Sequence, residues 1–245
     1  SIGNLDLHTD EGIQNYKGLK LSVRRRASSG LSLNGNYTVS RCFGDATNGG
    51  FPQLASGYTD PKNPAFDRGV CDQDRTHLAV VTVGAQTPMF DATALRMVAS
   101  NWRVSGILNA RSGQPLNVIA GGDPAFTGIQ QQRVQRVLDD PYPAEKTLTR
   151  YLNPAAFAQP APGTLGNFPR MGVRGPGYWV IDVALSRTIN FSTSHNVELR
   201  LETFNLLNNF NWGNPNVNFS SGLFGRIQTL AGDMRIMQFG VKYAF

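Results

Sequence analysis

The sequence has few charged residues, few cysteines and no long apolar run. Charged residues make up 16% of the 245 positions, against about 25% in an ordinary soluble domain. No stretch of about 18 apolar residues occurs, which excludes a transmembrane helix. A membrane β-strand is not excluded, because it needs only about ten residues of alternating character. The 40% hydrophobic content, with 14 Phe, argues against disorder, since such a chain can bury apolar surface.

The sequence also lacks signals for targeting, nucleic-acid binding or catalysis. Its first residues show neither an initiator Met nor a signal peptide, so we expect a mature N-terminus or a fragment. The net charge of +6 comes from scattered Lys and Arg, a pattern that favours solvated faces over a nucleic-acid partner. There is no GxSxG or HExxH motif and no paired acid and base. We therefore expect no enzyme, no cofactor and no metal.

What the sequence does contain is period-two alternation, which predicts strands with two unlike faces. In the run 196–205, for example, Leu199 and Leu201 alternate with Glu198, Arg200 and Glu202. Residues 1–15 are polar and irregular, and predict the end of a loop. The seven predicted strands cover residues 17–25, 31–43, 76–86, 102–110, 177–189, 196–205 and 235–245.

The connections between these strands alternate strictly in length. Short or middling connections are 28–30, 88–101 and 190–195, and long ones are 44–75, 112–176 and 206–234. Compact soluble domains rarely hold loops above about 12–15 residues, whereas outer-membrane barrels pair short periplasmic turns with long extracellular loops. The pattern predicts an all-β fold, an antiparallel transmembrane β-barrel portion of about seven long strands with long extracellular loops.

In such a barrel the two strand faces have different surroundings. Lipid covers the apolar face, here represented by Leu19, Val39, Leu185, Leu199 and Val241. The opposite face lines the lumen; its candidate residues are Glu198, Arg200, Glu202 and Lys242. Aromatic residues near strand ends are typical of interfacial girdles, and the candidates are Tyr37, Phe43, Trp102, Trp179, Tyr243 and Phe245.

Two groups of loop residues are candidates for special chemistry. Cys42 and Cys71 flank the first long loop and would be extracellular, where disulfides persist; we expect a disulfide, with two free thiols as the alternative. Asp72, Asp74 and His77 have the spacing of a short metal motif. We expect them to anchor the loop, with an ion pair to Arg75, because a hard cation usually wants six or more oxygen ligands.

The C-terminus resembles the signal that the outer-membrane barrel-assembly machinery reads. Such a strand end can be captured by pairing with an exposed sheet edge. It combines a terminal Phe, an aromatic residue two positions earlier and apolar residues at every second position before that. The matching residues are Met237, Phe239, Val241, Tyr243 and Phe245.

The remaining chain resembles the C-terminal barrel of Oar-like TonB-dependent receptors over nearly its whole length. The matching segments are Tyr151 to Phe157, Pro162 to Asn167, Arg174 to Gly177, Leu199 to Asn208, Ser112 to Pro115 and Cys71 to His77. The resemblance implies a barrel of 22 strands with an N-terminal plug in its lumen, which the lumen-facing residues Glu198, Arg200, Glu202 and Lys242 would contact. It also implies uptake of a ligand energised by an inner-membrane TonB complex. Residues 1–245 would then be the last third of that barrel, without plug or energy-coupling segment.

The expected partners are outer-membrane lipid, the assembly machinery, the plug domain and TonB complex, and a ligand that the sequence does not identify. The expected location is the outer membrane of a Gram-negative type cell. Two alternatives share the strand pattern. One is a passive porin or adhesin-type barrel, and the other is a secreted β-sandwich that binds a ligand with its long loops.

Overall fold

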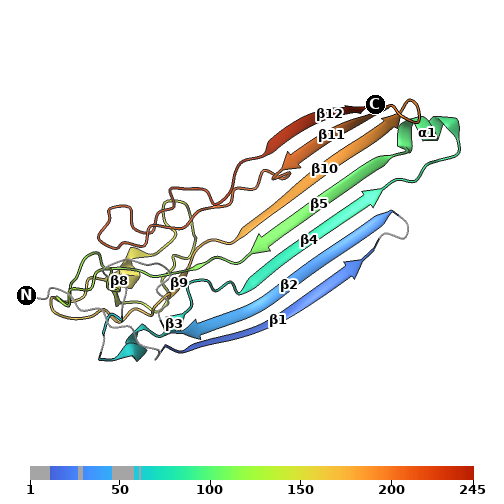
Figure 1. Ribbon diagram of the computed structural model, residues 1–245. Coiled ribbons are helices and arrows are strands. Elements are labelled where there is room, and N and C mark those ends of the chain that lie inside the picture. The colour runs from blue at the N-terminus through green and yellow to red at the C-terminus, as the bar shows by residue number, and fades with distance from the viewer. Residues whose placement is uncertain (1–11, 27–29, 46–57, 61) are drawn as a thin grey trace, which may run out of the picture.

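One antiparallel sheet of long strands dominates the structure, a computed structural model that describes residues 12–26, 30–45, 58–60 and 62–245. Its strands lie side by side in the order β1-β2-β4-β5-β10-β11-β12 (Figure 1). They have 9 to 14 residues, enough to cross a bilayer at a tilt. The strands are β1 (Gln14–Arg25), β2 (Leu31–Gly44), β4 (His77–Gln86), β5 (Trp102–Arg111), β10 (Tyr178–Asn190), β11 (Asn196–Phe204) and β12 (Ile236–Ala244).

All seven predicted strands are present, and each end lies within three residues of the predicted one. The largest difference is at β1, which begins at Gln14 rather than at residue 17. The rest of the predicted irregular segment, residues 1–11, lies outside the described residues. The prediction succeeds because the alternation is a local signal that any two-faced strand must carry.

The connections contain shorter elements. The short strands are β3 (Gly69–Val70), which pairs with β2, then β6 (Pro115–Leu116) with β9 (Val173–Arg174), and β7 (Gln135–Arg136) with β8 (Phe157–Ala158). The 3-10 helices are η1 (Pro64–Asp67) and η2 (Pro154–Ala156). The one α-helix in the described ranges, α1 (Thr93–Ala99), lies in the connection 88–101, which the sequence analysis identified only as a connection. Among the described residues, no helix is long and apolar enough to cross a bilayer.

The strand register gives the sheet two continuous and unlike faces. Residues of the apolar alternation stand opposite one another from strand to strand, as the period-two pattern requires. Many of these side chains are exposed, including Leu21, Val23, Phe239 and Val241. A row across six of the seven long strands, from β2 to β12, consists of Leu31, Ala85, Val104, Leu185, Leu201 and Phe239.

The buried hydrophobic core lies in the long connections and not in the sheet. Its centre is formed by Val118, Val134, Leu152 and Ala156, which are fully buried. No second layer covers the apolar face of the sheet in the described part of the chain (Figure 1). Among those residues, β1 and β12 each pair on one side only, so the sheet is open. The described part of the chain therefore leaves the apolar face of the sheet uncovered.

Candidate functional site: the loop cap and the two faces of the sheet

The three long connections fold together at one end of the sheet, which is the left end in Figure 1. We call their described parts, residues 58–60, 62–75, 112–177 and 205–235, the loop cap. Backbone hydrogen bonds join the second and third connections, from Ile227 N–H to the Leu148 carbonyl (2.7 Å) and from Tyr151 N–H to the Gly225 carbonyl (2.8 Å). The cap is thus one folded unit rather than three separate loops.

The motif segment Tyr151 to Phe157 forms the centre of this cap. Tyr151, Leu152 and Phe157 are buried, and Phe157 makes an edge-to-face contact with Phe168 (5.1 Å between ring centroids). Asn153 starts η2, because its side chain accepts a hydrogen bond from the Ala155 N–H. The segment thereby supplies both the turn and the apolar side chains that the cap is built around.

Three arginines of the second connection reach acidic residues of the first. Arg133 pairs with Asp67, Arg170 with Asp72, and Arg174 with Asp74 at 2.5 Å. Both side chains of the Arg133–Asp67 pair are buried, and Arg133 also donates to the carbonyls of Phe66 and Phe168. A buried pair is held only when its remaining donors are satisfied, so these contacts fix the two connections relative to each other.

The predicted ion pair with Arg75 is wrong. Arg75 donates instead to the Asp74 carbonyl and to the side chain of Gln114, while the acidic groups pair with arginines about 100 residues further along. His77 lies apart on β4, where its Nδ1 is 2.7 Å from the Tyr37 hydroxyl. Among the described residues, no three His, Cys, Asp or Glu side chains converge as a metal site.

The first connection is also tied at its base. Cys42 and Cys71 are bonded to each other, with Cα atoms 5.3 Å apart. Beside them, Arg68 Nε donates to Asp45 at 2.8 Å. This hydrogen bond, helped by the Ile13 N–H and the positive charges of Arg68 and Arg170, holds the pKa of Asp45 below its ordinary value even though burial opposes it.

Two tyrosines surround the backbone of Arg174. The hydroxyls of Tyr142 and Tyr151 both donate to the Arg174 carbonyl, at 3.2 and 3.1 Å, and their rings meet edge to face. Burial raises the pKa of both, that of Tyr151 to about 12. The pair thus remains neutral at physiological pH and secures the end of β9.

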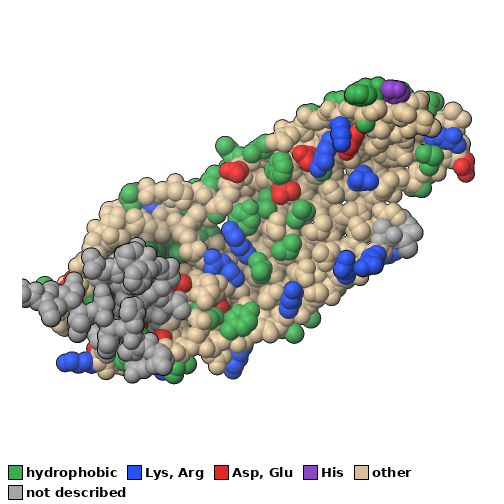
Figure 2. All heavy atoms as spheres, in the orientation of Figure 1, with side chains coloured by type: hydrophobic (Ala, Val, Ile, Leu, Met, Phe, Trp, Pro, Cys, Tyr) green, Lys and Arg blue, Asp and Glu red, His purple; other side chains and the backbone are tan. Residues whose placement is uncertain are grey.

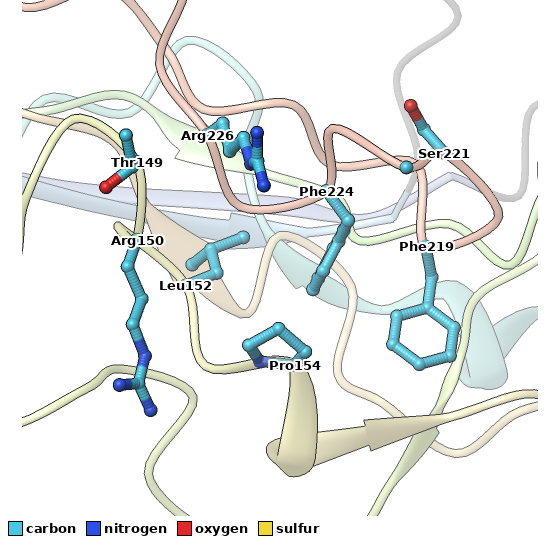
Figure 3. Close-up of a pocket in the computed structure, with 9 residues that line it drawn as sticks. Thr149, Arg150, Leu152, Pro154, Phe219, Ser221, Phe224 and Arg226 are labelled. Atoms are coloured by element: carbon cyan, nitrogen blue, oxygen red, sulfur yellow. The ribbon is translucent and has the colours of Figure 1, made fainter.

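An open pocket of about 500 Å³ lies in the cap between the second and third connections. Figure 3 shows Phe219 and Phe224 on one side, with Arg226 pointing toward Phe224 and Arg150 extending away from it. The two Phe rings are 5.1 Å apart. The lining of the pocket includes two arginines, Arg150 and Arg226, but no acidic residue. The motif segment Tyr151 to Phe157 contributes Leu152 and Pro154 to the lining. The sequence did not predict a pocket there, because its two sides are more than 60 positions apart.

The predicted lumen-facing residues share the polar face of the sheet. Glu198 stands opposite Lys242, and Glu202 opposite Gln238. Arg200 forms an ion pair with Glu202 on its own strand, at 2.6 Å. Charged side chains spread along the strands on the face shown in Figure 2. Whether this face contacts a plug remains a prediction.

The residues of the C-terminal pattern lie on the opposite, apolar face. Met237, Phe239, Val241 and Tyr243 alternate along β12 and are all exposed, as is Phe245 after it. Tyr243 stacks on His195, whose Nδ1 is 2.7 Å from the Tyr243 hydroxyl. β12 thus presents an apolar row and an unpaired edge, among the described residues, to its surroundings.

A sheet with one apolar and one polar face, strands of membrane-crossing length and long loops gathered at one end defines a protein of the membrane β-strand class. The chain belongs to the outer membrane beta barrel domain family, whose model matches residues 1–238. The protein is accordingly located in the outer membrane. No curated protein and no solved structure matches the chain.

Family membership decides between the architectures that the alternation left open. The chain is an all-β member of an outer-membrane β-barrel family, and the secreted β-sandwich is wrong. A sandwich would cover the apolar face with a second sheet, whereas the described strands form a single layer. From the general rule for such barrels we predict that the short connections face the periplasm and the loop cap faces outward.

Proposed function

We propose that this chain is the C-terminal barrel segment of an Oar-like TonB-dependent receptor, which takes up a ligand across the outer membrane in an energised step. The observation that carries the proposal is the folded loop cap. The motif segments on which the resemblance rests meet there: Pro115 and Leu116 pair with Arg174 and Val173, and Arg174 pairs with Asp74.

Each part of the chain has a role in this proposal. The apolar strand face lies in lipid, and the polar face, with Glu198, Arg200, Glu202 and Lys242, contacts a plug domain. The open edges of β1 and β12 pair with further strands of a 22-stranded barrel. The cap forms part of the outer mouth, and its open pocket at Phe224 and Arg226 offers a place for ligand contact. No step requires catalysis by this chain.

A passive porin is the competing function, and conductance separates the two. The full-length protein, purified from outer membranes, would be inserted into planar lipid bilayers. A plugged receptor shows no steady open conductance and binds the purified periplasmic domain of TonB. A steady ohmic conductance, together with no binding of the TonB domain above an unrelated periplasmic protein, would contradict the proposal.

A further inference from the structure

A charged residue, Arg187, interrupts the apolar face of the sheet. It lies on β10 in register with Trp102 of β5 and Leu199 of β11, which are both apolar-face residues. No other charged residue belongs to this face in β5, β10, β11 and β12. An arginine on a lipid-facing strand costs about 2–4 kcal/mol at the bilayer midplane but close to 0–1 kcal/mol near the interface, so its depth matters.

The surroundings place Arg187 at an interface and leave it incompletely bonded. It is three residues from the end of β10, at the end of the sheet with the short connections. Its guanidinium carbon lies 5.4 Å from the centre of the Trp102 ring. Its Nε is buried without a hydrogen-bond partner, and it is the one such side-chain atom among the described residues. Buried donors normally have a partner.

The helix α1 extends this surface beyond the strands. Trp102 Nε1 donates to the Val98 carbonyl at 2.8 Å, which ties the last turn of α1 to the first residue of β5 (Figure 1). Met97 and Val98 are 65% and 69% exposed. Apolar helix residues, a tryptophan and an arginine thus occur together, the combination that is typical of segments lying in a membrane interface.

We propose that Arg187, Trp102 and α1 form a binding site for a phospholipid of the periplasmic leaflet. The guanidinium of Arg187 donates to the phosphate, a partner whose geometry suits two parallel N–H···O bonds. The acyl chains lie along the next apolar row, at Val104, Leu185 and Leu201. Met97 and Val98 enter the headgroup region beside them. The site depends on the outer-membrane location alone and not on TonB coupling.

Retention of lipid by the full-length protein tests the site. The protein would be purified from outer membranes in maltoside detergent and its bound lipids weighed by native mass spectrometry. We expect retained phospholipid, and at least a tenfold lower occupancy in Arg187→Met. The matched control is Arg103→Met, since Arg103 pairs with the neighbouring Ser186 on the opposite face; its occupancy should equal that of the wild type.

Equal retention by the wild type and Arg187→Met would overturn the proposal, as would retention of lipopolysaccharide in place of phospholipid. A second measurement avoids any folding defect of the variant. The unfolding temperature of the wild type in detergent should rise with added short-chain phosphatidylglycerol or phosphatidylethanolamine, and not with the matching diacylglycerol, which lacks the phosphate. An equal rise with the diacylglycerol would also overturn the site.

Discussion

Arg133 and Asp67 form the least exposed ion pair of the loop cap, with 5% and 4% of their side chains accessible. Taking both charges out of water is costly, and the cost is offset only while each has its partner. The pair joins the first and second long connections. The contribution of the pair to the stability of the cap is therefore best measured by removing one partner and leaving the other buried.

We expect Arg133→Met to destabilise the cap by about 3–5 kcal/mol, because it leaves the Asp67 carboxylate buried without a counter-charge. The measurement is urea unfolding of the protein in lipid vesicles, followed by protease cleavage within residues 112–177. The matched control is Arg136→Met, which removes the exposed pair with Asp139 and should cost less than about 1 kcal/mol. Similar costs for the two variants would contradict the assignment.

Tyr151 gives the cap a pH dependence at high pH. Its pKa is raised from the ordinary 10.0 to about 12, so the folded state resists loss of the hydroxyl proton more than the unfolded state does. This contribution to stability is complete below pH 10 and is lost as the pH rises toward 12. Cleavage of the cap by protease should accelerate over that range, and Tyr151→Phe should reduce the acceleration. An identical profile in the variant would contradict the effect.

For individual residues, the sequence predicted which side chains anchor the loop but not which residues they pair with. The acidic group at Asp72 and Asp74 was expected to anchor the loop, and it does. Its partners, Arg170 and Arg174, are about 100 residues away and follow from how the connections fold over each other, which no local pattern contains. Arg187 was missed for a related reason. The effect of a single charge on an apolar strand face depends on its depth in the bilayer, which the sequence alone does not give.

The strands are the elements that the sequence predicted best. Each one must place apolar side chains on one side and polar side chains on the other, and this requirement is written into every second residue. The helix α1 was missed because its seven residues lie between two strands and carry apolar side chains that the structure leaves exposed. Helical periodicity is detected over a longer window with one buried apolar face. A seven-residue helix with exposed apolar side chains does not produce that pattern.

The facing of β11 leads to a paired prediction. Leu199 belongs to the apolar face and Arg200 to the polar face. We expect Leu199→Arg to reduce the free energy of unfolding from lipid vesicles by about 2–4 kcal/mol if the site is near the midplane. Arg200→Leu should cost much less, because it removes a charge from a face that does not touch lipid. Equal effects of the two substitutions would contradict the assignment of Leu199 to the lipid-facing side of β11 and of Arg200 to its polar side.

The pairing of β6 with β9 depends on Gly113. A Cβ atom at this position would lie 1.8 Å from the Gly175 carbonyl oxygen, so the two motif segments approach too closely for any larger residue. We expect Gly113→Ala to force them apart and to cost about 1–3 kcal/mol, the usual penalty of overpacking. Gly222→Ala is the control, since its added Cβ would meet nothing. An unchanged unfolding midpoint in Gly113→Ala would contradict the claim that this close approach requires glycine at position 113.

The two parts of the molecule are stabilised in different surroundings, the sheet in lipid and the loop cap in water. The sheet exposes its apolar face and two edges among the described residues, and such a surface aggregates in water. The cap has a buried core of its own together with a disulfide and ion pairs. The strand pattern predicted the first part, while the folding of the long connections into one cap depends on contacts between distant segments that the sequence pattern did not reveal.

The arrangement of these two parts across the outer membrane is the central claim, and labelling of single cysteines in intact cells tests it most directly. Ala144→Cys, exposed in the cap, and Thr193→Cys, in the connection between β10 and β11, would each be treated with a maleimide attached to a large polymer that cannot cross the outer membrane. The account predicts labelling of Ala144→Cys in intact cells, and of Thr193→Cys only after the outer membrane is permeabilised. The reverse pattern, or equal labelling of both sites in intact cells, would contradict it.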